Sequence, residues 1–286
     1  MARPRREQSD PRVIQDWIDE GRGADRNGKY QPWLRIQDLA SRGQSQRLTS
    51  HVTGDRIVHL LSGHESYAFF IFEWGPDVVD IREQFPLLPL EVTQEIAREL
   101  KVEHPADEET GLPVIMTTDF LVTRKTASGE KHFACPFKEV KELSSARTRE
   151  KLEIARRFHE KCGNSWGILT ERDVPIDLAR NLERLRETRD LSRFGGIPDE
   201  TIARVREVLL PIIWKQEESL ANATAHCDRQ LGLMNGTSLT IAFHFLYMRR
   251  WTADLLQPLQ PARPLVLLTP HPKENDVLVQ FPAAMA

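Results

Sequence analysis

The sequence predicts a mixed α/β domain followed by a mainly helical one, and two observations carry this expectation. Between residues 59 and 171, helical and strand-like patterns follow in the order helix, strand, hairpin, helix, strand. From about residue 171 the composition shifts, and helical patterns dominate from there on. The 286 residues suffice for two domains that each bury a core. We therefore expect an α/β domain over residues 1–170 and a helical domain over residues 171–286.

The elements of the first domain follow from local patterns. Residues 1–50 are basic and punctuated by glycine, which favours an arm with loops over a core. Residues 59–74 are apolar nearly all round at helical spacing and predict a buried helix. Residues 77–89 predict a short strand that ends at proline. After an acidic, proline-containing stretch, two strand-like segments flank TASG at residues 126–129, a pattern typical of a hairpin.

A second helix and a further strand complete this domain. Residues 144–163 predict a helix with a serine at its N-cap and Gly163 at its end. The segment SWGILTE at residues 165–171 predicts the strand. The domain is therefore expected to be one mixed layer of strands with helices packed on it.

The second domain shows three helical patterns and one strand-like segment, at residues 199–218, 219–234, 235–251 and 263–270. Three helices with a β-wing would form a winged-helix DNA-binding module, with Arg249 and Arg250 near its reading edge. A small helical protein-interaction domain fits almost equally well. The residues leave these two interpretations open.

Composition excludes several classes of protein. The chain is 40% hydrophobic and 28% charged, and its 39 Lys and Arg against 42 Asp and Glu give a net charge of −3. Any DNA affinity must therefore come from local patches. The three cysteines form no CxxC, and the nine histidines no HExxH, so a zinc site is not expected. No signal peptide and no membrane span is found, which predicts a soluble cytoplasmic protein.

The hairpin brings an acid and a lysine together. With a two-residue loop at Ser128–Gly129, Asp119 lies directly opposite Lys138, and Pro136 opposite Leu121. Directly opposed residues share a face, with Cβ atoms roughly 4.5–5.5 Å apart. Taken alone, the pair favours a surface ion pair of little energetic value over a catalytic site.

Glu65 changes that balance. On a helical wheel this residue lies inside an apolar stripe formed by Leu61, Ala68, Phe69 and Phe72. A buried carboxylate is costly unless it is paired, so Glu65 is either held for a cation or exposed by fraying of the helix. Glu73 lies at the edge of the same stripe and is a weaker candidate.

A helix glutamate, a strand aspartate and a lysine on the partner strand form a chemically coherent set. Two carboxylates such as Glu65 and Asp119 hold a hard divalent cation such as Mg²⁺. The cation polarises a phosphoryl group and activates water, and Lys138 stabilises the developing charge. The order of acid, Asp and (Glu/Gln)-x-Lys is similar to the loose pattern of the restriction-endonuclease-like fold.

A wider resemblance makes the assignment specific. The strings SRGQSQRLTSHVTGDRIVHLLSGHE, FEWGPDVVDIREQFPLLP, TTDFLV and RTREKLEIARRF, with EGRG and YQPWL before them, resemble the TnsA family. TnsA proteins are the endonuclease subunits of heteromeric Tns transposases. The resemblance runs from about residue 20 to about residue 173, and DIREQFPL is its most telling string. Beyond residue 173 it thins to length and helix order.

The resemblance implies an Mg²⁺-dependent nuclease, with Mn²⁺ as a substitute, that cuts the 5′ strands at transposon ends. It implies as partners transposon-end DNA, a TnsB-like transposase and a TnsC-like AAA+ ATPase, in a bacterial cytoplasm and at the nucleoid during action. The family's catalytic glutamate, aspartate and lysine fall on Glu65, Asp119 and Lys138. Metal ligands are expected at Glu65, Asp119 and the backbone carbonyl of Phe137.

One position departs from the family. Pro136 stands where the family has a glutamine two residues before the lysine, and proline requires an edge or bulged strand there. A literal Glu-x-Lys occurs from Glu139 to Lys141, but only with a shift, so we keep Lys138 and expect Glu139 to point to the other face. The departure supports a second hypothesis, a catalytically weakened structural subunit that binds DNA. A stand-alone restriction-type nuclease is a third.

Other polar residues receive simpler interpretations. His64 is expected on the helix surface or near a DNA phosphate rather than as a general base. Arg82 contacts either DNA or a neighbouring acid, Asp80 or Glu83. Four arginines on the helix after the hairpin either contact phosphates or form a solvated face: Arg147, Arg149, Arg156 and Arg157.

Overall fold

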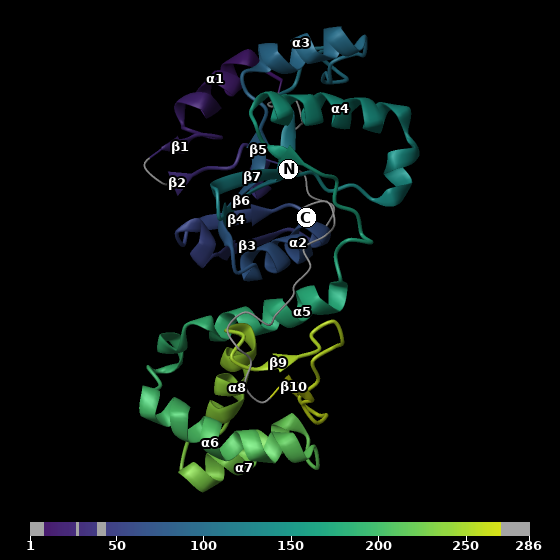
Figure 1. The fold of residues 1–286 in the computed structure, drawn as a ribbon. Helices are drawn as coiled ribbons and strands as arrows, with labels where there is room; N and C mark the ends of the chain where they lie inside the picture. The colour runs from purple at the N-terminus through teal and green to yellow at the C-terminus, as the bar shows by residue number, and fades with distance from the viewer. Residues whose placement is uncertain (1–8, 27–28, 39–43, 270–286) are drawn as a thin grey trace. The chain divides into compact units, whose positions relative to one another are not determined.

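The computed structural model describes residues 9–26, 29–38 and 44–269 of the chain. These residues form two compact units, and the chain passes from the first to the second between Val174 and Pro175. The first unit is mixed α/β and the second is mainly helical (Figure 1). In the described part of the chain, no helix is both long and apolar enough to cross a membrane.

A four-stranded mixed sheet forms the centre of the first unit. Its strands are β5 Val78–Pro86, β6 Thr117–Thr126, β7 Gly129–Cys135 and β8 Ser165–Trp166. They lie in the order β5-β6-β7-β8, with antiparallel pairs β5–β6 and β6–β7 and a parallel pair β7–β8. The expected strand, hairpin and final strand are confirmed.

The register of the hairpin differs from the prediction. Thr126 pairs with Gly129, so the two-residue loop is Ala127–Ser128 and not Ser128–Gly129. The hydroxyl of Thr126 accepts a hydrogen bond from the N–H of Ser128 (3.3 Å) and donates to the carbonyl of Gly129 (2.6 Å). These local bonds hold the loop one residue earlier in the chain.

The earlier position of the loop shifts every cross-strand pair. Leu121 lies opposite Ala134, not Pro136. The pairing ends at Phe120 and Cys135, and the same register extended by one residue would set Asp119 opposite Pro136 and not Lys138. The shift is by two residues, and side chains alternate between faces with a period of two. The predicted face of each residue is therefore unchanged.

Helices lie on both sides of this sheet. In Figure 1, α3 and α4 lie on one side, and α2 lies on the other with the β3–β4 hairpin. The three helices are α2 Gly63–Trp74, α3 Leu90–Leu100 and α4 Ala146–Lys161. The hairpin consists of β3 Gln46–Thr49 and β4 Ile57–Leu60.

The helix predicted over residues 59–74 begins later than expected. Residues 59 and 60 belong to β4, and α2 begins at Gly63. The hydroxyl of Ser62 accepts a hydrogen bond of 3.2 Å from the N–H of Glu65 and so caps the helix. The apolar run over residues 59–74 therefore covers two buried elements, which periodicity alone does not separate.

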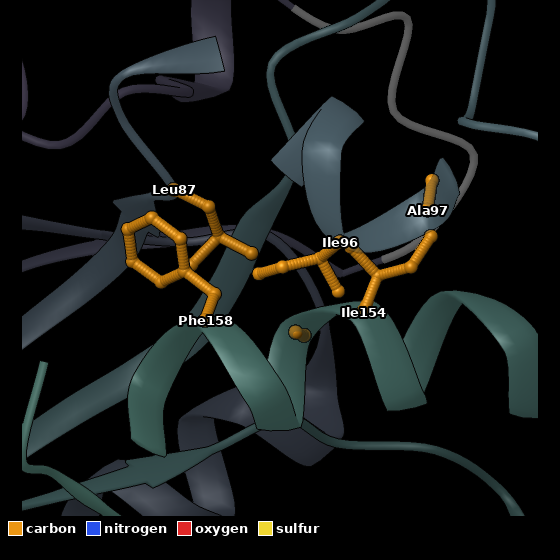
Figure 2. Close-up of a cluster of buried hydrophobic side chains, with 6 residues drawn as sticks. Leu87, Ile96, Ala97, Ile154 and Phe158 are labelled. Atoms are coloured by element: carbon orange, nitrogen blue, oxygen red, sulfur yellow. The ribbon is translucent and has the colours of Figure 1, made fainter. Parts of the chain in front are cut away.

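Helix α4 agrees with the prediction, whereas α3 was missed. Ser145 caps α4, and Gly163 follows its C-terminal end with a φ of 74°. α3 lies in the stretch that the sequence presented only as acidic and proline-containing. It packs on α4 through a buried apolar cluster, shown in Figure 2, of Leu87, Ile96, Ala97, Ile154, Ala155 and Phe158.

The expected N-terminal arm is partly wrong. Residues 1–8, 27–28 and 39–43 of this segment lie outside the described part, but Pro11–Asp19 form helix α1, capped by Asp10. Trp17 of this helix packs edge-on against Trp33, with ring centroids 5.2 Å apart. This segment also contains the short strands β1 Asp25–Arg26 and β2 Lys29–Tyr30.

The second unit contains four helices and a two-stranded sheet among its described residues. The helices are α5 Ile176–Leu185, α6 Asp199–Lys215, α7 Leu220–Leu231 and α8 Thr237–Tyr247. The strands are β9 Thr252–Ala253 and β10 Leu267–Thr269, paired antiparallel. The three predicted helices are confirmed as α6, α7 and α8, and α5 precedes them. Whether this unit acts as a winged-helix module stays a prediction.

Candidate active site

Glu65 is buried at the start of α2. Two residues that precede Glu65 in the sequence bind its side chain. Oε2 accepts a hydrogen bond from the N–H of Leu61 (3.0 Å), and Oε1 accepts one from the hydroxyl of Ser62 (3.1 Å). Only 7% of the residue is exposed. The alternative of a frayed helix with Glu65 in solvent is therefore wrong. Burial first, and then the nearby charge of Asp119, raise the pKa of Glu65 from 4.5 to about 7.

Asp119 on β6 is bound to the backbone of the neighbouring segment. Its Oδ2 accepts a hydrogen bond of 2.7 Å from the N–H of Phe137. The ammonium of Lys138 lies 4.0 Å from the same oxygen and donates a 2.7 Å hydrogen bond to the carbonyl of Phe137. Here the side chains of Asp119 and Lys138, and not the backbone of β6, form hydrogen bonds with the backbone of Phe137.

Asp119 and Lys138 meet even though the predicted register was wrong. The extended register would set Asp119 opposite Pro136, and Lys138 follows two residues later on the same face. Diagonal neighbours in a sheet are within reach of a long side chain. The lysine side chain spans this offset and places its ammonium beside Asp119.

Pro136 interrupts the pairing of β7 with its other neighbour. The N–H of Gly167 donates to the carbonyl of Ala134 (3.1 Å), and the N–H of Leu169 to that of Pro136 (2.9 Å). In a regular parallel ladder, the N–H of residue 136 would donate to the carbonyl of Gly167, between these two bonds. This bond is missing because proline has no N–H. β7 ends at Cys135, directly before the proline.

The expectation of an edge or bulged strand at Pro136 is wrong. β7 lies between β6 and β8, and its pairing with β6 carries no bulge. Pairing resumes at once, because Phe137 bridges to Leu169 and the N–H of Lys138 donates 2.9 Å to the carbonyl of Leu169. An interior segment therefore tolerates proline by losing one ladder bond, and Lys138 remains fixed by the sheet.

Gln84 on β5 is a site residue that the sequence analysis did not single out. Its Nε2 lies 3.2 Å from Oδ1 of Asp119 and 3.5 Å from Oε2 of Glu65. Its Oε1 accepts a hydrogen bond of 3.1 Å from the hydroxyl of Thr117. The side chain is 3% exposed. Its position inside the string DIREQFPL could have identified it, because an amide side chain in a buried strand nearly always has a hydrogen-bond partner.

A groove of about 370 Å³ opens beside these residues. Asp119, Pro136 and Lys138 line one part of it, and Thr148 and Lys151 of α4 line another. Since α4 begins at Ala146, its first turns face the groove. The positive charge of Lys151 and the N-terminal end of this helix are suited to a phosphate.

The donors present fit a hard divalent cation. Glu65 and Asp119 offer carboxylate oxygens, and the Phe137 carbonyl accepts from the ammonium of Lys138, which lies 4.0 Å from Asp119. Oxygen donors of this kind suit Mg²⁺ and Mn²⁺. In residues 9–26, 29–38 and 44–269, no three His, Cys, Asp or Glu side chains form a group that could hold a metal ion.

The other candidates near the site have their own partners. Glu73 is buried and lies 3.6 Å from Nδ1 of His51. Glu139 caps a short 3₁₀ helix, Val140–Ser144, through a capping box with Glu142 and forms an ion pair with Lys141. The Glu-x-Lys motif at residues 139–141 therefore stabilises the start of this 3₁₀ helix. His64 stacks on the ring of Phe137, with centroids 4.9 Å apart and planes 14° apart.

The candidate arginines also bind within the chain. Arg82 pairs with Asp80 over 3.3 Å, while Glu83 pairs with Arg56. On α4, Arg156 and Arg157 both pair with Glu153, and Arg156 also with Glu160. Arg147 pairs with Glu150, and Arg149 donates to the carbonyls of Leu143 and Ser144. These contacts favour the interpretation as a solvated helix face.

Comparison with known proteins identifies the family of this chain. Residues 75–171 match the family model of the TnsA-like endonuclease N-terminal domain, and residues 173–255 that of the TnsA endonuclease C-terminal domain. The chain is similar to the transposon Tn7 transposition protein TnsA of Escherichia coli, with 35% identity over 223 residues that cover 78% of each protein. The chain therefore belongs to the TnsA family of DNA endonucleases.

Proposed function

We propose that this protein cuts the 5′ strands at the ends of a transposon by metal-dependent hydrolysis of phosphodiester bonds. The proposal rests on its TnsA family membership and, above all, on one observation. Asp119 contacts the backbone N–H of Phe137 and lies 4.0 Å from the ammonium of Lys138, and the amide of Gln84 links it to the buried Glu65. A site of this composition places two carboxylates and a cationic side chain around one point, as hydrolysis of a phosphate diester requires.

Three groups would hold the cation: the carboxylates of Glu65 and Asp119 and the carbonyl of Phe137. Mg²⁺, or Mn²⁺ in its place, would polarise the phosphate and lower the pKa of bound water. Asp119 is oriented for this task by the N–H of Phe137, and Glu65 by the N–H of Leu61. Both carboxylates are thus fixed before a cation binds, which reduces the cost of assembling the site.

Lys138 would act on the substrate rather than on the cation. Its ammonium donates a hydrogen bond to the Phe137 carbonyl and lies 4.0 Å from Asp119. It is therefore held next to one of the two carboxylates. About a third of its side chain is exposed, which leaves it accessible from the groove. A cation held there stabilises the negative charge that develops on a phosphate under attack.

The DNA strand would enter along the groove beside α4. Lys151 and Thr148 face Asp119 and Lys138 there, and they would contact the phosphates that flank the scissile bond. Such contacts position a strand but do not read its sequence. Recognition of the transposon end would therefore come from partners, a TnsB-like transposase and a TnsC-like AAA+ ATPase, in the bacterial cytoplasm and at the nucleoid.

A structural subunit that binds ends without cutting is the second candidate, and Pro136 is the observation that favours it. The proline supplies no side-chain ligand where the family has glutamine. Against this stands the geometry around it, because the N–H of Lys138 still bonds to Leu169 and its ammonium bonds to the Phe137 carbonyl and lies 4.0 Å from Asp119.

Strand mapping on a mini-transposon donor tests the proposal. With both partners and Mg²⁺, we expect cuts at the 5′ strands of the ends, and with the isolated protein little cleavage. Absence of 5′ cuts under full partner conditions, with intact end binding, would support the structural subunit. Efficient, sequence-specific cutting by the isolated protein would instead support a stand-alone restriction-type nuclease.

A further inference from the structure

Gln84 occupies a position that a metal ligand would occupy. One terminal atom of its amide lies 3.2 Å from Asp119 Oδ1 and 3.5 Å from Glu65 Oε2. In an octahedral shell with Mg–O distances of about 2.1 Å, neighbouring ligand atoms lie about 3 Å apart. The amide terminus is thus spaced from the two carboxylates as a third ligand would be.

The backbone at Gln84 is held in a conformation that a glutamine adopts rarely. Its φ is 47°, in the left-handed region, which costs a residue with a Cβ on the order of 1 kcal/mol or more. The hydroxyl of Tyr30 and the N–H of Trp33 both donate to its carbonyl, at 3.4 and 3.2 Å. Neighbouring elements therefore hold the strained residue in place and direct its side chain between the carboxylates.

The amide of Gln84 presents its NH₂ group to the two carboxylates. Both carboxylates accept from Nε2, and Thr117 donates to Oε1, which fixes the orientation of the amide. This arrangement suits two carboxylates without a cation. It does not suit a bound cation, because N–H groups directed at positive charge are repulsive.

A half-turn of the amide removes this conflict. The terminal torsion of a glutamine is soft and roughly two-fold, so Oε1 and Nε2 exchange places with little movement of other atoms. The hydroxyl of Thr117 can follow the exchange, since it accepts as well as donates. The two polar groups of Gln84 would then have partners in both states.

We propose that Gln84 is a third side-chain ligand of the metal site. Its NH₂ group holds Glu65 and Asp119 together before the cation binds, and its Oε1 takes a coordination position afterwards. It thereby supplies an amide oxygen from β5 where Pro136 offers none. This inference rests on the proposed function, because it concerns the same cation.

Divalent-cation binding to the full-length protein without DNA tests the inference. Titration with Mn²⁺ or Mg²⁺, followed by calorimetry, compares wild type with Gln84→Met, which keeps the unbranched chain and removes the amide. We expect affinity to fall by about tenfold or more. If the amide only separates the carboxylates and moves aside, its N–H groups compete with the cation. Gln84→Met would then bind as tightly as wild type or more tightly, which would overturn the inference.

Two further variants keep the test decisive. Gln84→Asn suits the left-handed backbone better and keeps an amide that is one methylene too short, so it should fold well and also bind more weakly. Gln15→Met removes an exposed amide that bonds to Asp19 on α1, and it should leave the affinity unchanged. Wild-type protein that binds no divalent cation would count against the proposed function itself, whereas unweakened binding by both Gln84 variants would reject only the role of Gln84.

Discussion

The N–H of Phe137 donates a hydrogen bond of 2.7 Å to Oδ2 of Asp119. This bond replaces a ladder bond between β6 and the segment after β7, and it makes the orientation of the aspartate depend on the backbone next to Lys138. A change at Asp119 therefore removes a candidate metal ligand and also leaves the N–H of Phe137 without its partner.

Asp119→Ala should abolish 5′-strand cleavage while the protein stays folded. We expect a cost in stability of about 1–3 kcal/mol, because a partly buried N–H loses its acceptor. The 3′ joining chemistry would belong to the partner transposase, so donor assays should yield products joined at the 3′ ends and uncut at the 5′ ends. Persistence of simple cut-and-paste products in this variant would show that Asp119 is not essential.

Lys138 and Lys141 provide a matched pair for testing which lysine acts. Lys138→Ala should lower 5′ cleavage about 10²- to 10³-fold, the range for losing one group that stabilises developing charge, and leave cation affinity nearly unchanged. Lys141 is 79% exposed and pairs with Glu139, so Lys141→Ala should cleave at the wild-type rate. The reverse order of effects would move the site to the Glu-x-Lys register at residues 139–141.

Glu65 should contribute a loss of stability to the metal-free protein as pH rises between about 4.5 and about 7, against an opposite contribution from His59 and His159, whose pKa burial lowers from 6.5 to about 4. Because the pKa of Glu65 is raised to about 7, its protonated form stabilises the fold. That contribution is complete below the ordinary pKa of 4.5 and is lost as pH rises through the raised one. Thermal unfolding of wild type and Glu65→Gln in EDTA from pH 4.5 to 8 isolates this contribution as the difference between the two proteins.

Glu65→Gln is the control for this pH dependence. Its amide oxygen can accept from the N–H of Leu61, its NH₂ group can donate to the hydroxyl of Ser62, and it cannot ionise. The stability of wild type should therefore fall relative to that of Glu65→Gln as pH rises. An equal pH dependence in the variant and in the wild type would place the titrating group elsewhere.

Pro136→Gln should bind the cation as tightly as wild type or more tightly, and both proteins should cleave. The variant restores an N–H that can donate to the carbonyl of Gly167, and it adds an amide on the face of Lys138. Mg²⁺-dependent 5′ cleavage under identical partner conditions is the measurement. Activity confined to the Gln variant would show that the natural protein is a structural subunit.

A protein ending at residue 173 should fold and bind the cation but lose regulated cleavage. The candidate ligands lie before this point, and the first compact unit ends at Val174. Circular dichroism and Mn²⁺ titration test folding and binding, and the mini-transposon assay tests activity. Undiminished regulated cutting by the truncated protein would contradict a role for the second unit.

The sequence by itself determined the elements whose signals are local. Alternating strands around TASG, a serine cap and a terminal glycine specify β6, β7 and α4, because turns and caps are made by residues close in the chain. It also placed Asp119 and Lys138 on one face. That prediction survived the shift of the loop to Ala127–Ser128, since a change of register by two residues keeps every side chain on its face.

Only the tertiary structure decided what joins elements distant in the chain. Gln84 meets Asp119, 35 residues later, because β5 lies beside β6 and a left-handed backbone directs its amide between the carboxylates. The interior position of Pro136 depends on the segment after β8, where the N–H of Leu169 donates to the carbonyl of Pro136. Local patterns carry no information about such neighbours, because these contacts form only when the sheet assembles and its strand order fixes which side chains share a pocket.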